Sequence, residues 1–311
     1  MNRARRVLVT GAAGQVGVDL VDTLRGLHPP GADPDFQPDR TGIDPHDFEV
    51  LGLSRRELDV TDPSSLRAVM DQWRPSVIVH LAAYTAVDRA ESDAITCYSV
   101  NATATGLLST AARDHHAHLI TISTDYVFDG RKGSAYVEDD EPNALNVYGG
   151  SKRAGELLCA DQDTIVRTSW VMGVRGRNVV HLIAERAASG ARVRFVNDQT
   201  GTVTVAADLA RALVTMVRER PGGLWHIANS GTTTWFDIAE FAGAVLGRPR
   251  DFATAIGTND LDPAPAAVRP TRSDLSTAKW QAQQWLALPA WRDGVTRLLR
   301  DRPAPEARAR A

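Results

Sequence analysis

The amino-acid sequence predicts an α/β protein with a doubly wound parallel sheet and a smaller C-terminal lobe. Short runs of β-branched residues alternate with longer helical patterns, which is typical of βαβ units. These apolar runs do not alternate with polar residues, which indicates that helices cover both faces of the sheet. The third observation is a glycine-rich turn that follows the first run and begins at Gly11.

The elements follow from this pattern in order. Strands are predicted over residues 7–9, 48–53, 77–82, 119–123 and 164–170, and helices over 15–26, 64–73, 94–114 and 151–159. Beyond residue 170 the pattern loosens, and we expect a helix over 179–189, a strand over 193–196 and a helix over 206–218. The stretch 28–47 is rich in Pro, Gly and Asp and lacks periodicity, which predicts an exposed insertion.

The composition excludes several classes of function. With 43% apolar and 23% charged residues, the chain has the composition of a water-soluble globular protein. The net charge of -3 gives no general attraction to nucleic acid or to an anionic membrane, and no stretch approaches the ~20 apolar residues that cross a bilayer. Cys97 and Cys159 are too few for a disulfide framework or a four-ligand zinc site. We therefore expect a cytoplasmic protein.

The glycine-rich turn lies between the first strand and the first helix. Its glycines let the backbone turn tightly and approach a pyrophosphate, and the N–H groups that open the helix form an anion site. The spacing is G-x-x-G-x-x-G, which differs from the G-x-G-x-x-G of simple dehydrogenases. The turn predicts dinucleotide binding by Gly11, Gly14, Gln15, Val16 and Gly17.

The end of the second strand bears on the choice of cofactor. Enzymes that use NAD usually place a carboxylate there, whereas NADP-binding enzymes place an Arg for the 2′-phosphate. In this sequence Ser54, Arg55 and Arg56 follow the strand, and a guanidinium fork suits a phosphate. We predict NADPH, with NADH as the alternative because the insertion blurs the register.

The next segment has two interpretations. Asp59 and Val60 are expected to meet the adenine at the end of the third strand. The same segment could instead only cap the helix that follows, with Thr61 or Asp62 as the N-cap residue.

Length and pattern together predict two lobes, because a single hydrophobic core stops growing at roughly 250 to 300 residues. We expect a Rossmann-like NAD(P)-binding domain over residues 1–170 and about 200–227. A smaller substrate-binding lobe is expected over about 171–199 and 228–300. The tail 301–311 holds two prolines and is expected to be mobile.

A candidate reaction centre combines a phenol, an ammonium and a hydroxyl. Tyr148 and Lys152 are four residues apart and share one face of a helix. A nearby Lys lowers the pKa of Tyr from about 10, so Tyr148 could protonate a forming alkoxide near neutral pH. Thr124 ends a predicted strand, on the side of an α/β sheet where ligands lie. We expect Thr124, Tyr148 and Lys152 to be catalytic.

These motifs together resemble the dTDP-4-dehydrorhamnose reductase family of extended short-chain dehydrogenases. The resemblance lies in residues 11–17, 82–88, 123–130, 146–152 and 167–170, and more weakly in Asp198-Gln199-x-Gly201 and Arg269-Pro270. It implies NADPH-dependent reduction of the 4-keto group of dTDP-4-dehydro-6-deoxy-L-mannose, also called dTDP-4-dehydro-L-rhamnose, to dTDP-L-rhamnose. The partner would be a nucleotide-sugar substrate.

The resemblance also implies roles for single residues. Tyr148 would be the general acid, Lys152 its pKa-setting partner and a ligand of the nicotinamide ribose, and Thr124 the hydroxyl that orients the carbonyl. Further cofactor contacts are implied for Ala82, Ala83 and Tyr84, and substrate contacts for Thr85, Val87, Thr124, Asp125, Tyr126, Trp170 and Arg269.

Two of the implied positions have an alternative interpretation. Trp170 could equally be a core indole at the junction of the lobes. Asn101 resembles a helix asparagine behind the nicotinamide site, and could equally brace only the strand ends.

Departures from the family pattern keep alternatives open. Val203, Met172 and Ala144 differ from the usual residues in regions expected to face substrate, so another nucleotide-linked 4-keto-deoxysugar is the first alternative. A dehydratase or epimerase shares the fold, but related dehydratases carry Glu where this chain has Tyr126. From another class, the chain could be a non-catalytic NADP-binding subunit that resembles the methionine adenosyltransferase β subunit. The three intact catalytic groups favour an enzyme.

Metal binding and assembly are not determined by the sequence. Some relatives use a divalent ion such as Mg²⁺, but no spacing in this chain assigns metal ligands. A homodimer is also left open.

Overall fold

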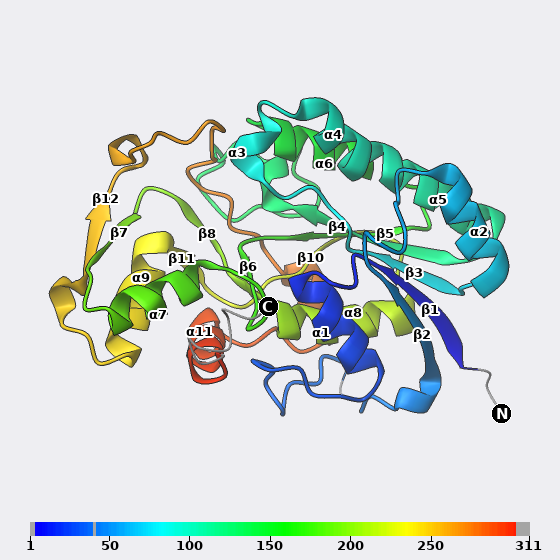
Figure 1. Ribbon diagram of the computed structural model, residues 1–311, viewed down its shortest axis with the longest axis horizontal. Helices are drawn as coiled ribbons and strands as arrows, with labels where there is room; N and C mark the ends of the chain where they lie inside the picture. Colours follow the sequence, from blue (N-terminus) through cyan, green and yellow to red (C-terminus); the bar gives the residue numbers. More distant parts are fainter. Residues whose placement is uncertain (1–3, 40–41, 303–311) are drawn as a thin grey trace.

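Six parallel strands form the central sheet of the computed structural model, which describes residues 4–39 and 42–302 (Figure 1). The strand order is β10-β5-β4-β3-β1-β2, and every neighbouring pair is parallel. The strands are β1 (Arg5–Thr10), β2 (Phe48–Leu53), β3 (Val77–His80), β4 (His118–Thr124), β5 (Thr164–Thr168) and β10 (Gly223–His226). The predicted doubly wound parallel sheet is confirmed.

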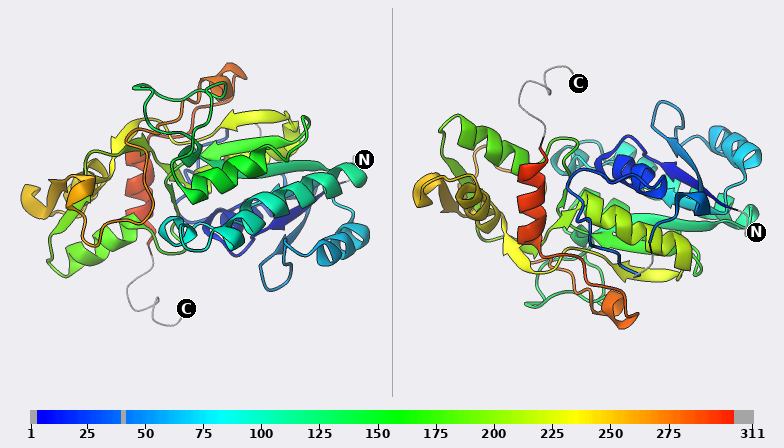
Figure 2. Two further views of the ribbon diagram at one scale, coloured as in Figure 1. Left: turned by 90° about the horizontal axis from the view of Figure 1, so that it is seen from above. Right: turned by 90° about the horizontal axis from the view of Figure 1, so that it is seen from below.

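Helices cover both faces of the sheet because successive strand residues point to opposite sides. On one face, Val7 and Val9 pack with apolar residues of α1 (Gln15–Leu24) and α8 (Ala206–Glu219). On the other face, Leu8 packs with α2 (Pro63–Trp73) and α5 (Ala104–Asp114). Figure 1 shows the sheet between these two helical layers, and each view of Figure 2 looks onto one of them.

The segment predicted as one helix over 94–114 has an irregular middle. It begins as α4 (Ala94–Tyr98), continues as a π-helical turn over Ser99–Thr103 and ends as α5. Such turns occur often at functional sites, and Asn101 lies in this one. The short helix α3 (Val87–Ala90) precedes it, and α6 (Val147–Glu156) packs beside it.

The later part of the chain builds a second apolar cluster. It gathers side chains from α7 (Val179–Ala188), α9 (Trp235–Val245) and α11 (Trp291–Arg300). The strand pairs around it are parallel β7 (Val193–Val196) with β12 (Ala253–Ile256), antiparallel β8 (Thr200–Thr202) with β11 (Thr232–Thr234), and parallel β6 (Val171–Met172) with β9 (Thr204–Val205).

No single position in the sequence divides the residues of the first apolar cluster from those of the second. Trp280 of α10 (Ala278–Ala282) and Leu288, both inside the segment expected in the second lobe, pack with the core of the sheet. The proposed division into lobes at residues 170, 200 and 228 stays a prediction.

The prediction of an exposed insertion over 28–47 is confirmed for residues 42–47, which are mostly exposed, and is wrong for much of 28–39. Phe36 is only 5% exposed and packs in the core of the sheet, and Ala32 packs in the second cluster. Arg211 of α8 donates to the carbonyl of Phe36 at 2.6 Å, and Arg218 pairs with Asp39 at 3.1 Å. This irregular segment is held by side chains from a distant helix, which periodicity does not reveal.

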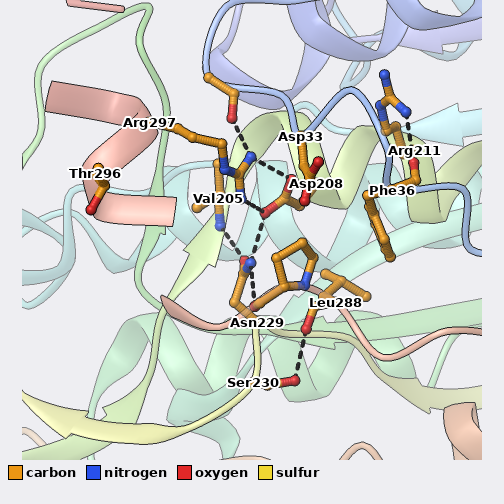
Figure 3. A network of polar contacts seen from close by, with 12 residues as sticks. Asp33, Phe36, Val205, Asp208, Arg211, Asn229, Ser230, Leu288, Thr296 and Arg297 are labelled. Carbon is orange, nitrogen blue, oxygen red and sulfur yellow. Dashed lines mark hydrogen bonds and ion pairs between the residues drawn. The ribbon is translucent and has the colours of Figure 1, made fainter. Parts of the chain in front are cut away.

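A buried ion pair joins α8 to α11, and Figure 3 shows its surroundings. The guanidinium of Arg297 donates to both carboxylate oxygens of Asp208 at 2.9 and 2.7 Å and also to the carbonyl of Gly31. Asn229 donates to the same carboxylate at 2.7 Å and accepts from the amide of Val205. Helix α11, which belongs to the second cluster, is thereby fixed to α8, which packs on the sheet.

The C-terminal tail can be described only at its start. The carboxylate of Asp301 accepts from the amide of Gly31 at 2.9 Å. Residues 303–311 of the tail lie outside the described residues, so its expected mobility stays a prediction. No helix among the described residues is both long and apolar enough to span a bilayer.

Candidate active site

The glycine-rich turn lies against the loop that follows β3. Gly11 has φ +68°, and a Cβ built on it would lie 2.5 Å from the amide nitrogen of Ala82. A Cβ on Gly17 would lie 2.3 Å from the carbonyl oxygen of Gly11. The amide of Ala12 donates to the carbonyl of Leu53 at 3.1 Å, so the turn is also tied to the end of β2. Only glycine fits where the turn folds back on itself.

The turn opens α1 without a side chain that caps the helix. Gly14 is the N-cap residue, and no side-chain oxygen among the described residues caps this end. The N–H groups of Gln15, Val16 and Gly17 therefore stand at the positive end of the helix dipole. These donors and the close glycine backbone fit a dinucleotide pyrophosphate. The side chain of Gln15 instead accepts from the amide of Gly173 at 3.0 Å, which links α1 to the loop after β6.

The predicted cofactor residues after β2 have different surroundings. Ser54 donates its amide and hydroxyl to the carboxylate of Glu57, at 2.8 and 2.7 Å. The side chains of Arg55 and Arg56 are exposed just beyond the end of β2. Two guanidinium groups are therefore available where a 2′-phosphate is expected.

The placement of Asp59 and Val60 at the end of the third strand is wrong. They lie between β2 and α2, where Asp59 accepts from Thr61 and Val60 is buried. Asp62 is the N-cap residue of α2 and accepts from the amides of Ser64 and Ser65. The capping interpretation is thus confirmed for Asp62, and a contact of Asp59 with adenine stays a prediction.

Asn101 joins the loop after β3 to the helix that carries the candidate catalytic residues. Its side-chain oxygen accepts from the amide of Tyr84 at 2.9 Å, and its nitrogen donates to the carbonyl of Tyr84 at 3.0 Å. The same nitrogen donates to the hydroxyl of Ser151 on α6 at 2.9 Å. Asn101 therefore braces the loop of Ala82, Ala83 and Tyr84 against α6.

Thr124, Tyr148 and Lys152 meet at the carboxyl end of β4. Thr124 is the last residue of the strand, and its side chain lies near enough to the phenol of Tyr148 to lower the pKa of that group. Asn146 caps α6 by accepting from the amide of Gly149 at 2.8 Å. A Cβ on Gly149 would lie 2.1 Å from the carbonyl oxygen of Tyr126, so glycine lets α6 approach the strand end. Lys152 donates to the carbonyl of Ile122 at 3.0 Å.

The expected lowering of the pKa of Tyr148 by Lys152 is wrong in this structure. Burial raises the pKa of Tyr148, and the nearby side chain of Thr124 opposes this only in part. Burial lowers the pKa of Lys152 to about 8, although Cys97 and Glu156 act in the opposite direction. The spacing of four residues indicated that Tyr148 and Lys152 lie close together. It could not reveal how strongly burial desolvates both side chains.

A cavity of about 550 Å³ lies on the side of the second cluster. Its lining includes Asp88, Arg194, Phe195, Gln199, Trp235 and Arg269. Arg269 donates to both carboxylate oxygens of Asp88 at 2.8 and 2.6 Å, and this ion pair lowers the pKa of Asp88 to about 2. Thr85 and Val87 lie in the chain segment just before Asp88.

The aromatic candidates divide between this cavity and the reaction centre. Trp170 stacks on Trp235, with ring centroids 4.0 Å apart. Tyr126 meets the ring of Tyr148 edge to face at 6.0 Å, and the nearby Arg269 acts to lower its pKa. Trp235 and Asp88 were not among the predicted site residues, although Asp88 ends the segment 82–88 that carries the resemblance.

Other expected contacts prove to be internal. Asp125 is buried and accepts from the hydroxyl of Ser273 at 2.5 Å, and burial raises its pKa to about 7. Met172 and Val203, expected in regions that face substrate, are both buried in the second cluster. That expectation is wrong for these two residues. Among the described residues, no group of three His, Cys, Asp or Glu side chains is placed to hold a metal ion.

The parallel sheet, the glycine cradle and the Thr-Tyr-Lys set define the class of extended short-chain dehydrogenases. Within that class, the chain belongs to the family described as RmlD substrate binding domain, whose model matches residues 40–303.

Relatives of known name cover nearly the whole chain. A dTDP-4-dehydrorhamnose reductase of Streptomyces griseus is 37% identical and covers 94% of this chain and 92% of its own. A dTDP-4-keto-6-deoxy-D-glucose reductase of Streptomyces niveus is 34% identical, with 94% and 95% covered. Among solved structures, a dTDP-4-dehydrorhamnose reductase of Bacillus anthracis in complex with NADP is 29% identical. It has a TM-score of 0.83 and covers 95% of this chain and 98% of its own.

Proposed function

We propose that the protein reduces the 4-keto group of dTDP-4-dehydro-6-deoxy-L-mannose with NADPH and releases dTDP-L-rhamnose. The observation that carries the proposal is the contact between Thr124 and Tyr148 at the sheet edge that also holds the glycine cradle. The S. griseus relative is named for this activity, and the B. anthracis structure holds NADP.

Different residues of the chain would bind the cofactor and the nucleotide sugar. The N–H groups at the start of α1 would hold the pyrophosphate, and Arg55 with Arg56 would accept the 2′-phosphate. Bound NADPH would supply the hydride that reduces the sugar carbon. Arg194 places positive charge at the cavity, which suits the diphosphate of a nucleotide sugar, whereas the charge of Arg269 is paired with Asp88.

Proton transfer falls to the groups at the end of β4. The hydroxyl of Thr124 would orient the carbonyl oxygen, and Tyr148 would give its phenolic proton to that oxygen as it becomes an alkoxide. Lys152 would bind the nicotinamide ribose, since it does not lower the pKa of Tyr148 in this structure. One hydride on carbon and one proton on oxygen complete the alcohol.

A second candidate is the reduction of another dTDP-linked 4-keto-deoxysugar. The S. niveus relative and a probable dTDP-4,6-dihydroxy-2-methyloxan-3-one 4-ketoreductase of Streptomyces antibioticus are 34% and 35% identical, close to the dTDP-4-dehydrorhamnose reductases. Tyr126 stands where related dehydratases carry Glu, so elimination is not proposed. A cytoplasmic location stays a prediction, and no homodimer or divalent ion is proposed.

The proposal is tested by NADPH oxidation with purified protein and each candidate dTDP-4-keto sugar. We expect turnover with the L-mannose form and a fall in kcat of about 100-fold or more for Tyr148→Phe, because the proton donor is lost. Tyr136→Phe is the matched control, since Tyr136 bonds to Asp129 away from the reaction centre. No turnover by the wild type with this sugar would contradict the proposed substrate, and an active Tyr148→Phe variant would contradict the mechanism.

A further inference from the structure

Helix α6 meets β4 through a ladder of three polar contacts. Tyr148, Lys152 and Glu156 lie at intervals of four residues, so they follow one another along one side of the helix. The phenol of Tyr148 lies near the side chain of Thr124, and Lys152 donates to the carbonyl of Ile122 at 3.0 Å. The carboxylate of Glu156 accepts from the hydroxyl of Ser123 at 2.5 Å. Three consecutive strand residues therefore lie opposite three turns of the helix, and two of them, Ile122 and Ser123, hydrogen-bond to it.

Glu156 is also held from the next strand. Arg167 of β5 donates to both oxygens of its carboxylate, at 2.8 and 2.7 Å. The side chains of this ion pair are 2% and 1% exposed. Ser123 and Arg167 are direct neighbours in the register of β4 and β5. The carboxylate thus binds two adjacent strands at one level, one residue before Thr124.

An ion pair buried as deeply as Glu156–Arg167 contributes little to the stability of the fold by itself. Removing two charges from water offsets most of their attraction, and apolar residues of similar size often stabilise a core equally well. Its hydrogen bonds are directional, however, and they fix one helix turn against one strand residue. A slip of α6 would move the phenol of Tyr148 away from Thr124, and misplacement by about 1 Å can reduce a rate about 100-fold.

We propose that Glu156 is a positioning residue of the reduction, which holds α6 against Ser123 and Arg167 so that Tyr148 stays opposite Thr124. This inference rests on the proposed function. Glu156 itself does not touch the reacting atoms. It acts through the helix that carries the proton donor and through its charge on Lys152.

Glu156 also affects the pKa of Lys152, together with the other titratable groups that face this lysine. Lys152 faces Cys97 on α4, His80 on β3 and Glu156 on its own helix. Burial lowers the pKa of Lys152 to about 8, and the carboxylate of Glu156 opposes that effect. Loss of this charge should lower the pKa of Lys152 further. The alkaline fall of kcat should then move to lower pH.

Three variants distinguish the effect of the length of the Glu156 side chain from the effect of its charge. Glu156→Gln removes the charge, Glu156→Asp keeps the charge but shortens its reach, and Ser123→Ala removes only the contact with β4. We expect kcat to fall about 10-fold or more in Glu156→Gln and Glu156→Asp and about 3-fold in Ser123→Ala, with little change in KM for NADPH. The alkaline limb should move only in Glu156→Gln.

Asp208→Asn is the matched control, because it breaks a buried bidentate Asp–Arg pair at the interface of α8 and α11 (Figure 3). It should lower Tm without changing kcat or its pH profile. A Glu156→Gln variant that loses stability but keeps the wild-type kcat and pH profile of kcat would overturn the inference. If Glu156→Gln does not fold, a wild-type kcat in Ser123→Ala would overturn it instead. Absence of turnover by the wild type would overturn the proposed function and this inference with it.

Discussion

Gly11 and Ala82 pack backbone against backbone, and a Cβ on Gly11 would lie 2.5 Å from the amide nitrogen of Ala82. This approach joins the turn after β1 to the loop after β3, the two segments expected to hold the cofactor. The backbone of Gly11 also has φ +68°, which other residues rarely adopt.

Gly11→Ala is therefore expected to weaken NADPH binding about 10-fold or more and to lower the free energy of unfolding by about 2 kcal/mol. Fluorescence titration with NADPH and thermal unfolding measure the two effects. Gly133→Ala is the control, since Gly133 has φ +77° but nothing within 4 Å of its added Cβ. Equal losses in both variants would show that backbone strain, and not the contact with Ala82, is responsible.

Arg55 is expected to select NADPH over NADH. Its exposed guanidinium lies just beyond β2, and loss of a charge-assisted bond to a phosphate should weaken NADPH binding by about 2 kcal/mol, or roughly 30-fold. Arg55→Ala should leave the KM for NADH unchanged. Arg67→Ala, which removes an exposed charge from α2, should change neither constant. A parallel loss for both cofactors would contradict a role in recognising the 2′-phosphate.

Gly201→Ala is expected to disturb binding of the nucleotide sugar. A Cβ at this position would lie 2.8 Å from the indole of Trp170, which stacks on Trp235 in the cavity wall. The KM for the sugar should rise about 10-fold while the KM for NADPH stays the same. The smaller ring of Trp170→Phe should relieve the clash, so the double variant should bind the sugar better than Gly201→Ala alone. A double variant no better than Gly201→Ala would refute this steric explanation.

His118 should make the fold sensitive to acid. It bonds to Thr164 at 2.7 Å at the start of β4, and burial lowers its pKa to about 4. Because the folded state favours neutral imidazole, this stability is complete above about pH 6.5 and is lost as the pH falls towards 4. The free energy of unfolding should fall by up to about 1.4 kcal/mol per pH unit in this window through His118. Thermal unfolding from pH 7 to about 4 should show a shallower slope in His118→Gln than in the wild type or in a His46→Gln variant at an exposed site.

The sequence allowed the sheet, the glycine turn and the Thr124, Tyr148 and Lys152 set to be predicted, because each depends on local spacing or on burial of whole strands. What it could not indicate depends on tertiary contacts. The segment around Phe36 is irregular, and it is buried only because Arg211 and the sheet lie beside it. The pKa of Tyr148 depends on the packing around it, and Trp235 joins the site only through its stack with Trp170.

The first turn of α1 begins at Gly14, where Ser, Thr, Asp or Asn would ordinarily accept its N–H groups. A pyrophosphate held by those groups would serve as the missing cap, so the cofactor would complete a structural element of the protein. Folding and cofactor supply are then thermodynamically linked, since any ligand that binds only the folded chain stabilises it according to its free concentration. The half-life of this protein in a cell would accordingly report the size of the whole dinucleotide pool, oxidised and reduced.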